Sequence, residues 1–389
     1  RMYSRERSKY ARLKQQYNTI LNQLTSSENA VLEHLNKDNF TKEEVYNIST
    51  KDPVLAQHLS IIKQSYGFGY ETIEGLKKSL KRDLKSFNER LDYNLNIDFD
   101  GRSIVNDDPN DIRDKAYGDN NVRPKEGRSH GTHVSGIIAA KRNNGIGING
   151  AADNVKIMAI RNTPNGDEYD KDVALGVYYA VNNGAKVINM SFGKGFSDHS
   201  NWVKDAIAYA AKHDVLIVAA AGNNGENNDF VKNYPNDQDG IGEEVSDNFI
   251  SVGASTSDYS SDLIAGFSNY GKSSVDVFAP GTRIYSSYPN NKYEFAQGTS
   301  MAAPLVSGIA ALLFSQYPKL SASEVKKIIM VSGLPIKKEV ALEDGTISLM
   351  NNLCKSGRLV NAYNALIMSE TMAACRQAVQ AGTASLAAE

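Results

Sequence analysis

The chain of 389 residues predicts an α/β fold in which helices cover both faces of a mainly parallel sheet, with a separate helical segment in front of it. Three observations support this prediction. Short apolar runs alternate with amphipathic helical segments from about residue 130 onward. Polar residues follow several of these runs directly. Residues 1–92, by contrast, are polar, have helical spacing and show no strand pattern. Alternation of this kind is typical of parallel strands joined by helices.

The N-terminal segment, residues 1–92, predicts amphipathic helices that form a hairpin or small bundle. Apolar residues recur at steps of three and four over residues 10–24 and again over residues 73–91, with Lys, Arg, Glu and Gln between them. Packing of these helices on one another or on the rest of the chain is the simplest interpretation. Contact of this helical insertion with a partner is the alternative.

The remainder predicts a sheet with ligands at one edge. Five apolar runs read as buried strands, at residues 155–160, 186–191, 215–221, 249–254 and 275–280. Residues 170–184 and 201–214 read as the helices between them. The acidic run at residues 166–172 reads as a solvated helix start, with the rim of a ligand cleft as the alternative. In parallel sheets ligands lie beyond the carboxyl ends of the strands, so functional residues are expected just after each run.

Composition excludes several classes of partner. Lys and Arg number 43 against 45 Asp and Glu, so the net charge of −2 favours neither nucleic acid nor an anionic membrane surface. No apolar run reaches the roughly 20 residues that span a bilayer, and the first residues lack the apolar core of a signal peptide. Cys354 and Cys375, the two cysteines, have no metal-ligand spacing.

The first loop that could carry catalytic residues is HGTHVSG, which contains His130 and His133. An apolar helical face begins directly afterwards, so His130 is expected near a helix start and His133 about one turn in. A histidine at a helix entrance can present a ring nitrogen to a cleft, and histidine is the usual general base near neutral pH. Taken alone, the loop fits ordinary helix-capping residues equally well.

Two further loops complete a possible catalytic set. Asn223 follows a buried strand in AAAGNNG, where one amide donor aimed into a cleft would suit an oxyanion site. Ser300, in QGTSMAAP, leads into a helix with Pro304 expected in its first turn, so backbone N–H groups and the positive helix end lie beside the hydroxyl. An Asn-Gly turn and a serine cap are the corresponding structural interpretations.

The chain order of these residues discriminates among serine hydrolases. An α/β-hydrolase needs its histidine downstream of the serine, and no histidine follows His213. His130 before Ser300 leaves the chymotrypsin and subtilisin orders, and the parallel-sheet pattern argues against an all-β barrel. The subtilisin order remains.

The three loops, HGTHVSG, AAAGNNG and GTSMAAPLVSG, resemble the histidine, oxyanion and serine blocks of the subtilisin-like (subtilase) serine peptidases. The resemblance implies a three-layer subtilisin-like fold and an exported serine endopeptidase that acts on peptide or protein substrates. It implies Ser300 as nucleophile, His130 as general base and then acid, and Asn223 with the Ser300 backbone N–H as oxyanion donors. His133 would be structural.

The triad aspartate is the missing element. In the family it ends a buried strand upstream of the histidine, and no such strand precedes His130 here. The preferred interpretation is that residues 1–92 are a helical insertion between the aspartate strand and the histidine, as in some bacterial members, so that the aspartate lies upstream. Asp98, in a polar context, is the weaker candidate. Without an aspartate we expect very low turnover, because a comparable triad mutation elsewhere costs about 10,000-fold.

The resemblance also implies substrate and ion contacts. Residues predicted to bind substrate follow two of the strands: Ser191, Phe192, Gly193, Ala221 and Gly222. The loop at residues 139–152 resembles one in which many subtilases bind calcium, which leaves room for a structural calcium ion with Asn143 or Asn144 as side-chain ligand. The mechanism itself requires no cofactor.

The sequence therefore predicts a helical insertion at residues 1–92, a subtilisin-like core lacking its first strand at residues 93–368, and an Ala-rich tail at residues 369–389. A catalytically silent module that binds peptides or partners is the alternative function. The presence of His130, Asn223 and Ser300 together argues against it, since binding needs none of the three. An esterase with the same machinery stays open.

Overall fold

A computed structural model describes residues 2–123, 128–163, 166, 168–239 and 243–386. The chain divides into two compact units, Arg1–Val105 with Pro164–Asp167, and Asn106–Thr163 with Glu168–Glu389. We refer to them as the helical unit and the core unit.

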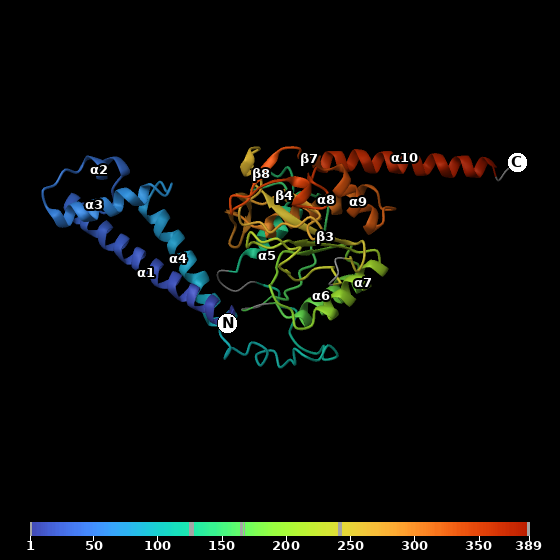
Figure 1. Ribbon diagram of the computed structural model, residues 1–389, viewed down its shortest axis with the longest axis horizontal. Coiled ribbons are helices and arrows are strands. Elements are labelled where there is room, and N and C mark those ends of the chain that lie inside the picture. Colours follow the sequence, from blue (N-terminus) through green and yellow to red (C-terminus); the bar gives the residue numbers. More distant parts are fainter. Residues whose placement is uncertain (1, 124–127, 164–165, 167, 240–242, 387–389) are drawn as a thin grey trace. The chain divides into compact units, whose positions relative to one another are not determined.

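The helical unit contains the predicted amphipathic helices: α1 (Met2–Leu35), α2 (Lys42–Asn47), α3 (Pro53–Tyr66) and α4 (Ile73–Glu89) (Figure 1). Side-chain caps start α2, α3 and α4, with Thr41, Asp52 and Thr72 each accepting a backbone N–H. The helices α3 and α4 pack on α1, and their apolar faces form one buried cluster. Burial of each large aliphatic side chain contributes roughly 1.5–3 kcal/mol, which explains how a polar segment folds.

The helical part continues beyond the predicted boundary at residue 92. A π-helical turn, Arg90–Asn94, follows α4 directly. Tyr3 Oη and Arg7 Nε both donate to the carbonyl of Leu95, at 2.8 and 3.2 Å, which ties this turn to the start of α1. These contacts hold the turn and Leu95 within the helical unit, which extends to Val105.

The core unit is built on a six-stranded sheet in the order β1-β2-β3-β4-β10-β7. Its strands are β1 (Val187–Met190), β2 (Leu216–Ala220), β3 (Phe249–Ser255), β4 (Val277–Pro280), β10 (Arg358–Leu359) and β7 (Leu334–Pro335). Neighbours from β1 to β10 pair in parallel, and β7 is antiparallel. The predicted mainly parallel sheet is thus confirmed, as are four of the five predicted strands.

Helices cover both faces of this sheet, giving the predicted three layers (Figure 1). One face packs against α6 (Asp170–Asn182) and α7 (Ser200–Lys212), through a buried cluster that includes Ile217 and Phe249. The other face packs against α8 (Thr299–Gln316) and α9 (Ala322–Ser332), through a cluster that includes Val218 and Val252. Alternate residues of a strand face opposite layers, which explains why the central strands are apolar throughout.

Smaller elements complete the core unit. Helix α5 (His130–Ala139) packs on α8 and on the hairpin of β5 (Ile284–Tyr288) and β6 (Lys292–Ala296). A second hairpin joins β8 (Glu339–Ala341) and β9 (Ile347–Leu349). Helix α10 (Ala362–Leu386) runs without a break from the predicted core into the predicted tail.

The prediction of a strand at residues 155–160 is wrong for this structure. The segment belongs to no sheet and, among the described residues, its backbone forms no hydrogen bond. Its apolar side chains are exposed, with Ile157 45%, Met158 40% and Ile160 36% accessible. Among the described residues, the strand β1 pairs with β2 alone, so its other edge has no partner strand there. The run contains strand-forming residues, but the described residues provide no partner strand for it.

A second correction concerns α8. The helix begins at Thr299, so Pro304 lies in its second turn and not in the first. A proline there cannot donate a hydrogen bond to the carbonyl four residues back. That carbonyl belongs to Ser300 and, as described below, accepts a bond from another residue.

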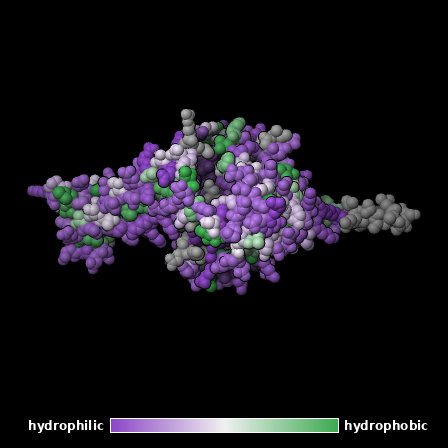
Figure 2. Space-filling view, turned by 90° about the horizontal axis from the view of Figure 1, so that it is seen from below, coloured by the Kyte–Doolittle hydropathy of each residue, from purple (hydrophilic) through white to green (hydrophobic). Residues whose placement is uncertain are grey.

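Among the described residues, α8 is the one helix long and apolar enough to cross a bilayer, and most of it is buried inside the core unit. This finding is weak evidence for a membrane span, because core helices of this composition pass the same test. The face drawn in Figure 2 is mostly hydrophilic, with hydrophobic residues in small separate groups, as is common on protein surfaces.

Candidate active site

The nucleophile candidate, Ser300, is the second residue of α8 and is half-buried. Its hydroxyl donates to the carbonyl of Ser191 at 3.1 Å, and Ser191 Oγ donates back to the carbonyl of Ser300 at 2.9 Å. The second bond takes the place of the helical bond that Pro304 cannot make. The proline thus lets Ser191, at the end of β1, hold the start of α8.

A chain of side chains extends this link between the strand and the helix. Asn189 Nδ2 donates to Ser191 Oγ at 2.8 Å, and Ser307 Oγ donates to Asn189 Oδ1 at 2.9 Å. Ser307 lies about two turns beyond Ser300 on α8. Two separated points of the helix are therefore fastened to β1, which orients its first turn.

The oxyanion candidate, Asn223, has one end of its amide fixed and the other free. Its Oδ1 accepts from the Thr299 backbone N–H at 2.8 Å and from Thr299 Oγ1 at 3.0 Å. Because an N–H must face an oxygen, these bonds define which amide atom is which. Among the described residues, no group pairs with Asn223 Nδ2, and the side chain is exposed. Its two donor hydrogens are available to a ligand.

Two donors converge beside Gly298. A Cβ placed on that glycine would lie 3.6 Å from Asn223 Nδ2 and 3.7 Å from the Ser300 backbone nitrogen, with Asn223 Oδ1, which is already bonded to Thr299, at 3.5 Å. The residue has φ +143, which side-chain-bearing residues rarely adopt, so glycine keeps this point open. The Ser300 N–H lies in the first turn of α8, where backbone N–H groups lack helical partners and the helix dipole favours negative charge. A developing oxyanion would be stabilised there.

The base candidate, His130, is the first residue of α5 and is exposed to solvent. The protein atoms around the ring nevertheless disfavour its charged form and lower the pKa of His130, and the nearby His133 lowers it further. No hydrogen bond of the His130 ring occurs among the described residues. The helices α5 and α8 pack on each other through Val134, Ile137 and Met301. The Ser300 hydroxyl nevertheless donates to the Ser191 carbonyl and not to His130.

His133 is structural, as expected. The side chain is 2% accessible, and its Nε2 lies 3.1 Å from the carbonyls of Ile284 and Glu294, which belong to the two strands of the β5–β6 hairpin. Ser286 Oγ donates back to the His133 carbonyl at 2.7 Å. These bonds hold α5 against the hairpin and so support the position of His130.

The aspartate candidate, Asp98, lies in a turn of the helical unit, where its backbone N–H donates to Asn96 Oδ1 at 3.1 Å. The turn is not the end of a strand. Within the described core unit, no carboxylate pairs with His130.

The predicted substrate residues divide into two groups. Among the described residues, the backbones of Phe192 and Gly193 form no hydrogen bond, so they are available to pair with an extended peptide. The backbone groups of Ala221 and Gly222 are all used within the core unit, by Val252, Asn228, Thr299 and Asn269. These two residues can contribute shape but no backbone pairing.

The loop predicted to bind calcium offers few suitable ligands. Asn144 Oδ1 accepts the Ile146 N–H at 3.0 Å, and the Asn143 N–H donates to Asn149 Oδ1 at 2.8 Å. The loop contains no carboxylate, and the guanidinium of Arg142 donates to the Gly150 carbonyl at 2.5 Å. This set fits a doubly charged cation poorly.

Sequence reasoning missed several residues that organise the site. The roles of Thr299, Asn189 and Pro304 depend on contacts between segments far apart in the sequence. The serine block contains Thr299 and Pro304 in plain view, but their partners emerge only when the first turn of α8 meets the ends of β1 and β2.

A family model described as the subtilase family matches residues 29–352. The chain belongs to the subtilase family. It is 36% identical over 292 residues to the thermophilic serine proteinase of Bacillus sp. (strain AK1), covering 75% of this chain and 63% of that protein. It is 40% identical over 211 residues to the cell wall-associated protease of Bacillus subtilis (strain 168), covering 54% and 21%.

Among solved structures, that of a cold-adapted subtilisin-like serine proteinase matches this subtilase with 31% identity and a TM-score of 0.46, covering 59% of this chain and 74% of that one. The chain spans less than two thirds of the length of both curated relatives described above.

Proposed function

We propose that this subtilase is a serine endopeptidase, with Ser300 as nucleophile, His130 as general base and then acid, and Asn223 with the Ser300 N–H as oxyanion donors. The observation that carries the proposal is the convergence of the two donors beside Gly298, directly ahead of Ser300. A binding module has no need of two unpartnered donors at the start of a helix that also bears a serine.

The chemistry would proceed in two halves. The Ser300 hydroxyl gives up its hydrogen bond to the Ser191 carbonyl, passes its proton to His130 and attacks the peptide carbonyl. The two donors then stabilise the resulting oxyanion. His130 then gives that proton to the departing amine, leaving an acyl group on Ser300. Water, deprotonated by His130, releases the acyl group. The lowered pKa keeps His130 neutral near pH 7, as a base must be.

We further propose that a strand from outside residues 1–389 lies against the open edge of β1 and supplies the carboxylate that orients His130. Two observations support this proposal: the open edge of β1, and the segment 155–160 with exposed Ile157, Met158 and Ile160, whose backbone has no partner among the described residues. Unpaired strand edges and exposed apolar runs are unfavourable in water. One inserted strand would pair with the edge and cover the apolar run. Residues 1–389 alone would then be only weakly active.

Labelling with a fluorophosphonate probe tests both proposals. Residues 1–389 would be compared with a version that also carries whatever residues its gene encodes upstream of Arg1. Labelling of Ser300 in the longer version alone supports the external carboxylate. Strong labelling of residues 1–389 would show that an internal carboxylate such as Asp98 orients His130. No labelling of either would contradict the peptidase proposal.

The pH dependence of labelling adds an independent measurement. In residues 1–389 the rate should fall as pH drops through the lowered His130 pKa, below the usual value of about 6.5. A carboxylate beside the ring stabilises its charged form and would move this midpoint upward in the longer version. Equal midpoints would argue against a newly supplied carboxylate.

A catalytically silent peptide-binding module is the second candidate. The bond of Ser300 Oγ to the Ser191 carbonyl, in place of one to His130, favours it. Catalytic hydrogen bonds are often long or absent before substrate binds, so this observation weighs less than the converging donors. Turnover of matched peptide and ester substrates would separate a peptidase, an esterase and a silent module.

Export, calcium and the helical unit are further proposals. One matching relative is named a cell wall-associated protease, which supports an extracellular or envelope location. Calcium at Asn143 or Asn144 would rest mainly on carbonyl oxygens, so we expect weak binding, measurable as a shift of the unfolding temperature with added calcium. The helical unit would be the surface that contacts a partner, testable by deleting it and measuring cleavage of protein and of short peptide substrates.

A further inference from the structure

The residues on both sides of Asn223 bond to one residue of a distant segment, Asn269. The backbone N–H of Asn269 donates to the Gly222 carbonyl at 2.9 Å. The side-chain Oδ1 of Asn269 accepts the backbone N–H of Asn224 at 2.9 Å and that of Glu226 at 3.1 Å. A single residue therefore holds the backbone before and after the oxyanion candidate.

These bonds fix the conformation of Asn223 through its two neighbouring peptide groups. Peptide groups are planar, so the orientations of the group before a residue and of the group after it set φ and ψ of that residue. The first group carries the Gly222 carbonyl, the second carries the Asn224 N–H, and both bond to Asn269. Among the described residues, the N–H and the carbonyl of Asn223 itself form no hydrogen bond. The bonds to Asn269 are thus what orients both groups.

Asn269 is itself held by the central sheet. Its side chain is only 1% accessible. The preceding Ser268 Oγ donates to the Asn269 carbonyl at 2.9 Å and accepts the backbone N–H of Ala254, in β3, at 2.8 Å. The strand β3 pairs with β2, which leads into the loop of Asn223. A rigid strand therefore fixes Asn269, and Asn269 fixes the loop that follows the next strand.

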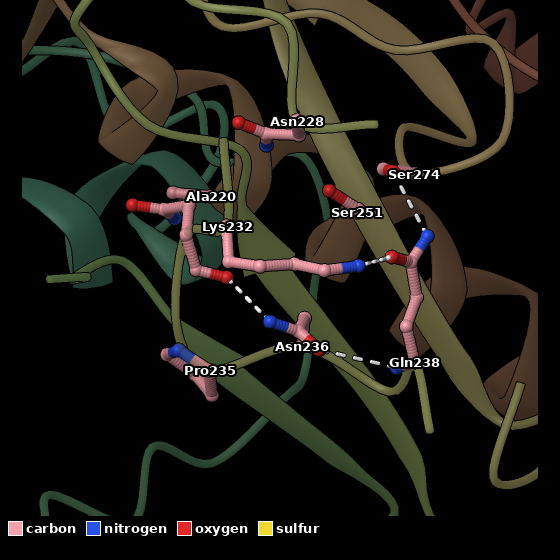
Figure 3. A pocket seen from close by; sticks show the side chains of 9 residues that line it. Ala220, Asn228, Lys232, Pro235, Asn236, Gln238, Ser251 and Ser274 are labelled. Atoms are coloured by element: carbon pink, nitrogen blue, oxygen red, sulfur yellow. Dashed lines mark hydrogen bonds between the residues drawn. The ribbon is translucent and has the colours of Figure 1, made fainter. Parts of the chain in front are cut away.

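The other end of the Asn269 amide is used as well. Its Nδ2 donates to Asn228 Oδ1 at 2.9 Å, and Asn228 Nδ2 donates to the Ala221 carbonyl at 2.8 Å. Asn228 lines a small polar cavity, several of whose side chains bond to one another but not to Asn228 (Figure 3). Because Oδ1 must face N–H groups and Nδ2 must face an oxygen, the Asn269 amide has one orientation. A leucine of similar shape would leave two N–H groups of the loop without their acceptor.

The close approach of Asn269 explains the glycine that precedes Asn223. A Cβ on Gly222 would clash with Asn269 Nδ2 and would lie 3.0 Å from Asn269 Cγ. The φ of Gly222 is +111, which side-chain-bearing residues rarely adopt. Glycine at this position lets the Asn269 amide reach the backbone on both sides of the oxyanion candidate.

We propose that Asn269 is a positioning residue for the oxyanion site, which holds the loop so that Asn223 Nδ2 stays beside Gly298 during the reaction. The inference rests on the proposed peptidase function. Asn269 is buried and bonds to the loop, so it acts through Asn223 and not on substrate. Loss of its side chain would let the loop shift, and a misplacement of about 1 Å can cost roughly 100-fold in rate.

Steady-state hydrolysis of a peptide substrate tests this role. The version of the chain that labels faster with the fluorophosphonate probe is used. Asn269→Ala should lower kcat about 10- to 100-fold and leave KM within about 2-fold, because the oxyanion donor acts on charge that develops only in the transition state. Unchanged kcat for Asn269→Ala would overturn the inference.

Asn248→Ala is the matched control, because Asn248 is equally buried but lies at the opposite end of β3. It is 1% accessible, and its Nδ2 donates to the Val215 carbonyl at 2.7 Å. Both variants should lower the midpoint of thermal unfolding by several degrees, since each leaves buried backbone groups unpaired. Only Asn269→Ala should lower kcat, and an equal loss of kcat in both variants would overturn the inference.

A double-mutant cycle separates positioning from a general loss of structure. In the Asn223→Ala background no side-chain donor remains to be positioned, so Asn269→Ala should lower kcat by less than about 2-fold more. An equal loss of kcat with and without Asn223 would overturn the inference.

A milder variant carries the same test if Asn269→Ala does not fold. Asn228→Ala removes only the partner of Asn269 Nδ2 and the bond to Ala221. It should lower kcat about 3- to 10-fold at constant KM, again only when Asn223 is present. Unchanged kcat for Asn228→Ala would then overturn the inference.

The unaltered chain separates this inference from the function on which it rests. If that chain hydrolyses no peptide, the peptidase proposal fails and the positioning role with it. If that chain hydrolyses peptide while the variants give any of the overturning results, the positioning inference alone is wrong.

Discussion

Asn223 shows how a single side chain is prepared for one task at the candidate site. Its oxygen is held by Thr299, and its Nδ2, for which the described residues offer no partner, is kept 3.6 Å from the point that a Cβ on Gly298 would occupy. Preorganised donors of this kind are effective because they need not reorient during the reaction.

Substitution of Asn223 tests that role directly. Asn223→Ala should lower turnover of a peptide substrate on the order of 100- to 1000-fold with little change in KM, since the donor acts on the developing charge. The neighbouring Asn224 is exposed and is the matched control, so Asn224→Ala should leave turnover nearly unchanged. Equal losses for both variants would indicate a general disturbance of the loop.

Asp237 is a buried carboxyl group that lowers the stability of the folded chain when it is ionised. It is 8% accessible, and its Oδ2 has no hydrogen-bond partner among the described residues. Burial raises the pKa of Asp237 from 3.8 to about 7, and Asp276 and Glu244 reinforce this, whereas Lys326 and Lys355 oppose it.

This pKa predicts how stability depends on pH. Below about pH 4 the carboxyl is protonated in both the folded and the unfolded chain, so it has no effect. Between about pH 4 and 7 the unfolded chain loses the proton first, so the folded state becomes less stable as pH rises. Asp237→Asn should therefore raise the midpoint of thermal unfolding progressively from pH 4 to 7 and by a constant amount above it.

The gain from Asp237→Asn should be at most about 4 kcal/mol, the limit set by the pKa difference. The exposed Asp258→Asn variant is the control and should show no such trend. A gain for Asp237→Asn that does not vary with pH would mean that charge is not the cause.

At the scale of elements, the start of α6 and the segment after β1 are fastened to each other. Lys194 Nζ lies 3.0 Å from Asp170 Oδ1 and donates to the Glu168 carbonyl at 2.5 Å. Asp170 and Lys171 are both buried, so the prediction of a solvated helix start is wrong for them. Lys171 pairs with Asp107 and donates to the Asp108 carbonyl at 2.7 Å. Tertiary ion pairs bury charges that the sequence pattern places in solvent.

Loss of the Lys194 contact should loosen the segment that pairs with substrate. Lys194→Met should raise KM several-fold with a smaller change in kcat, and lower stability by about 2–4 kcal/mol because Asp170 is left buried without its cation. Peptide hydrolysis and thermal unfolding measure the two effects. Lys186→Met, an exposed lysine just before β1, is the control. An unchanged KM would show that Lys194 supports stability alone.

For the whole molecule, the open edge of β1 is the main feature. Among the described residues, β1 pairs with β2 on one side and with no strand on the other. Residues 155–160 have strand-forming composition, but no partner for them occurs among the same residues. Sheets with such an edge tend to associate with further strands.

Hydrogen exchange tests this interpretation. In residues 1–389, the amides of residues 155–160 should exchange within seconds, whereas those of β2, paired on both sides and buried, should be protected for far longer. In the version extended upstream, residues 155–160 should become protected. Strong protection of residues 155–160 in the shorter version would contradict the open-edge interpretation.

The sequence by itself determined the α/β class, the four central strands, the helices between them and the three loops that carry His130, Asn223 and Ser300. These depend on local periodicity, on turn chemistry and on chain order, which are all readable along one chain. Only the tertiary structure decided that residues 155–160 have no partner strand among the described residues, and that the Ser300 carbonyl, which Pro304 cannot pair with, accepts a hydrogen bond from Ser191. Each of these outcomes depends on contacts between residues far apart in the sequence, and local periodicity carries no information about such contacts.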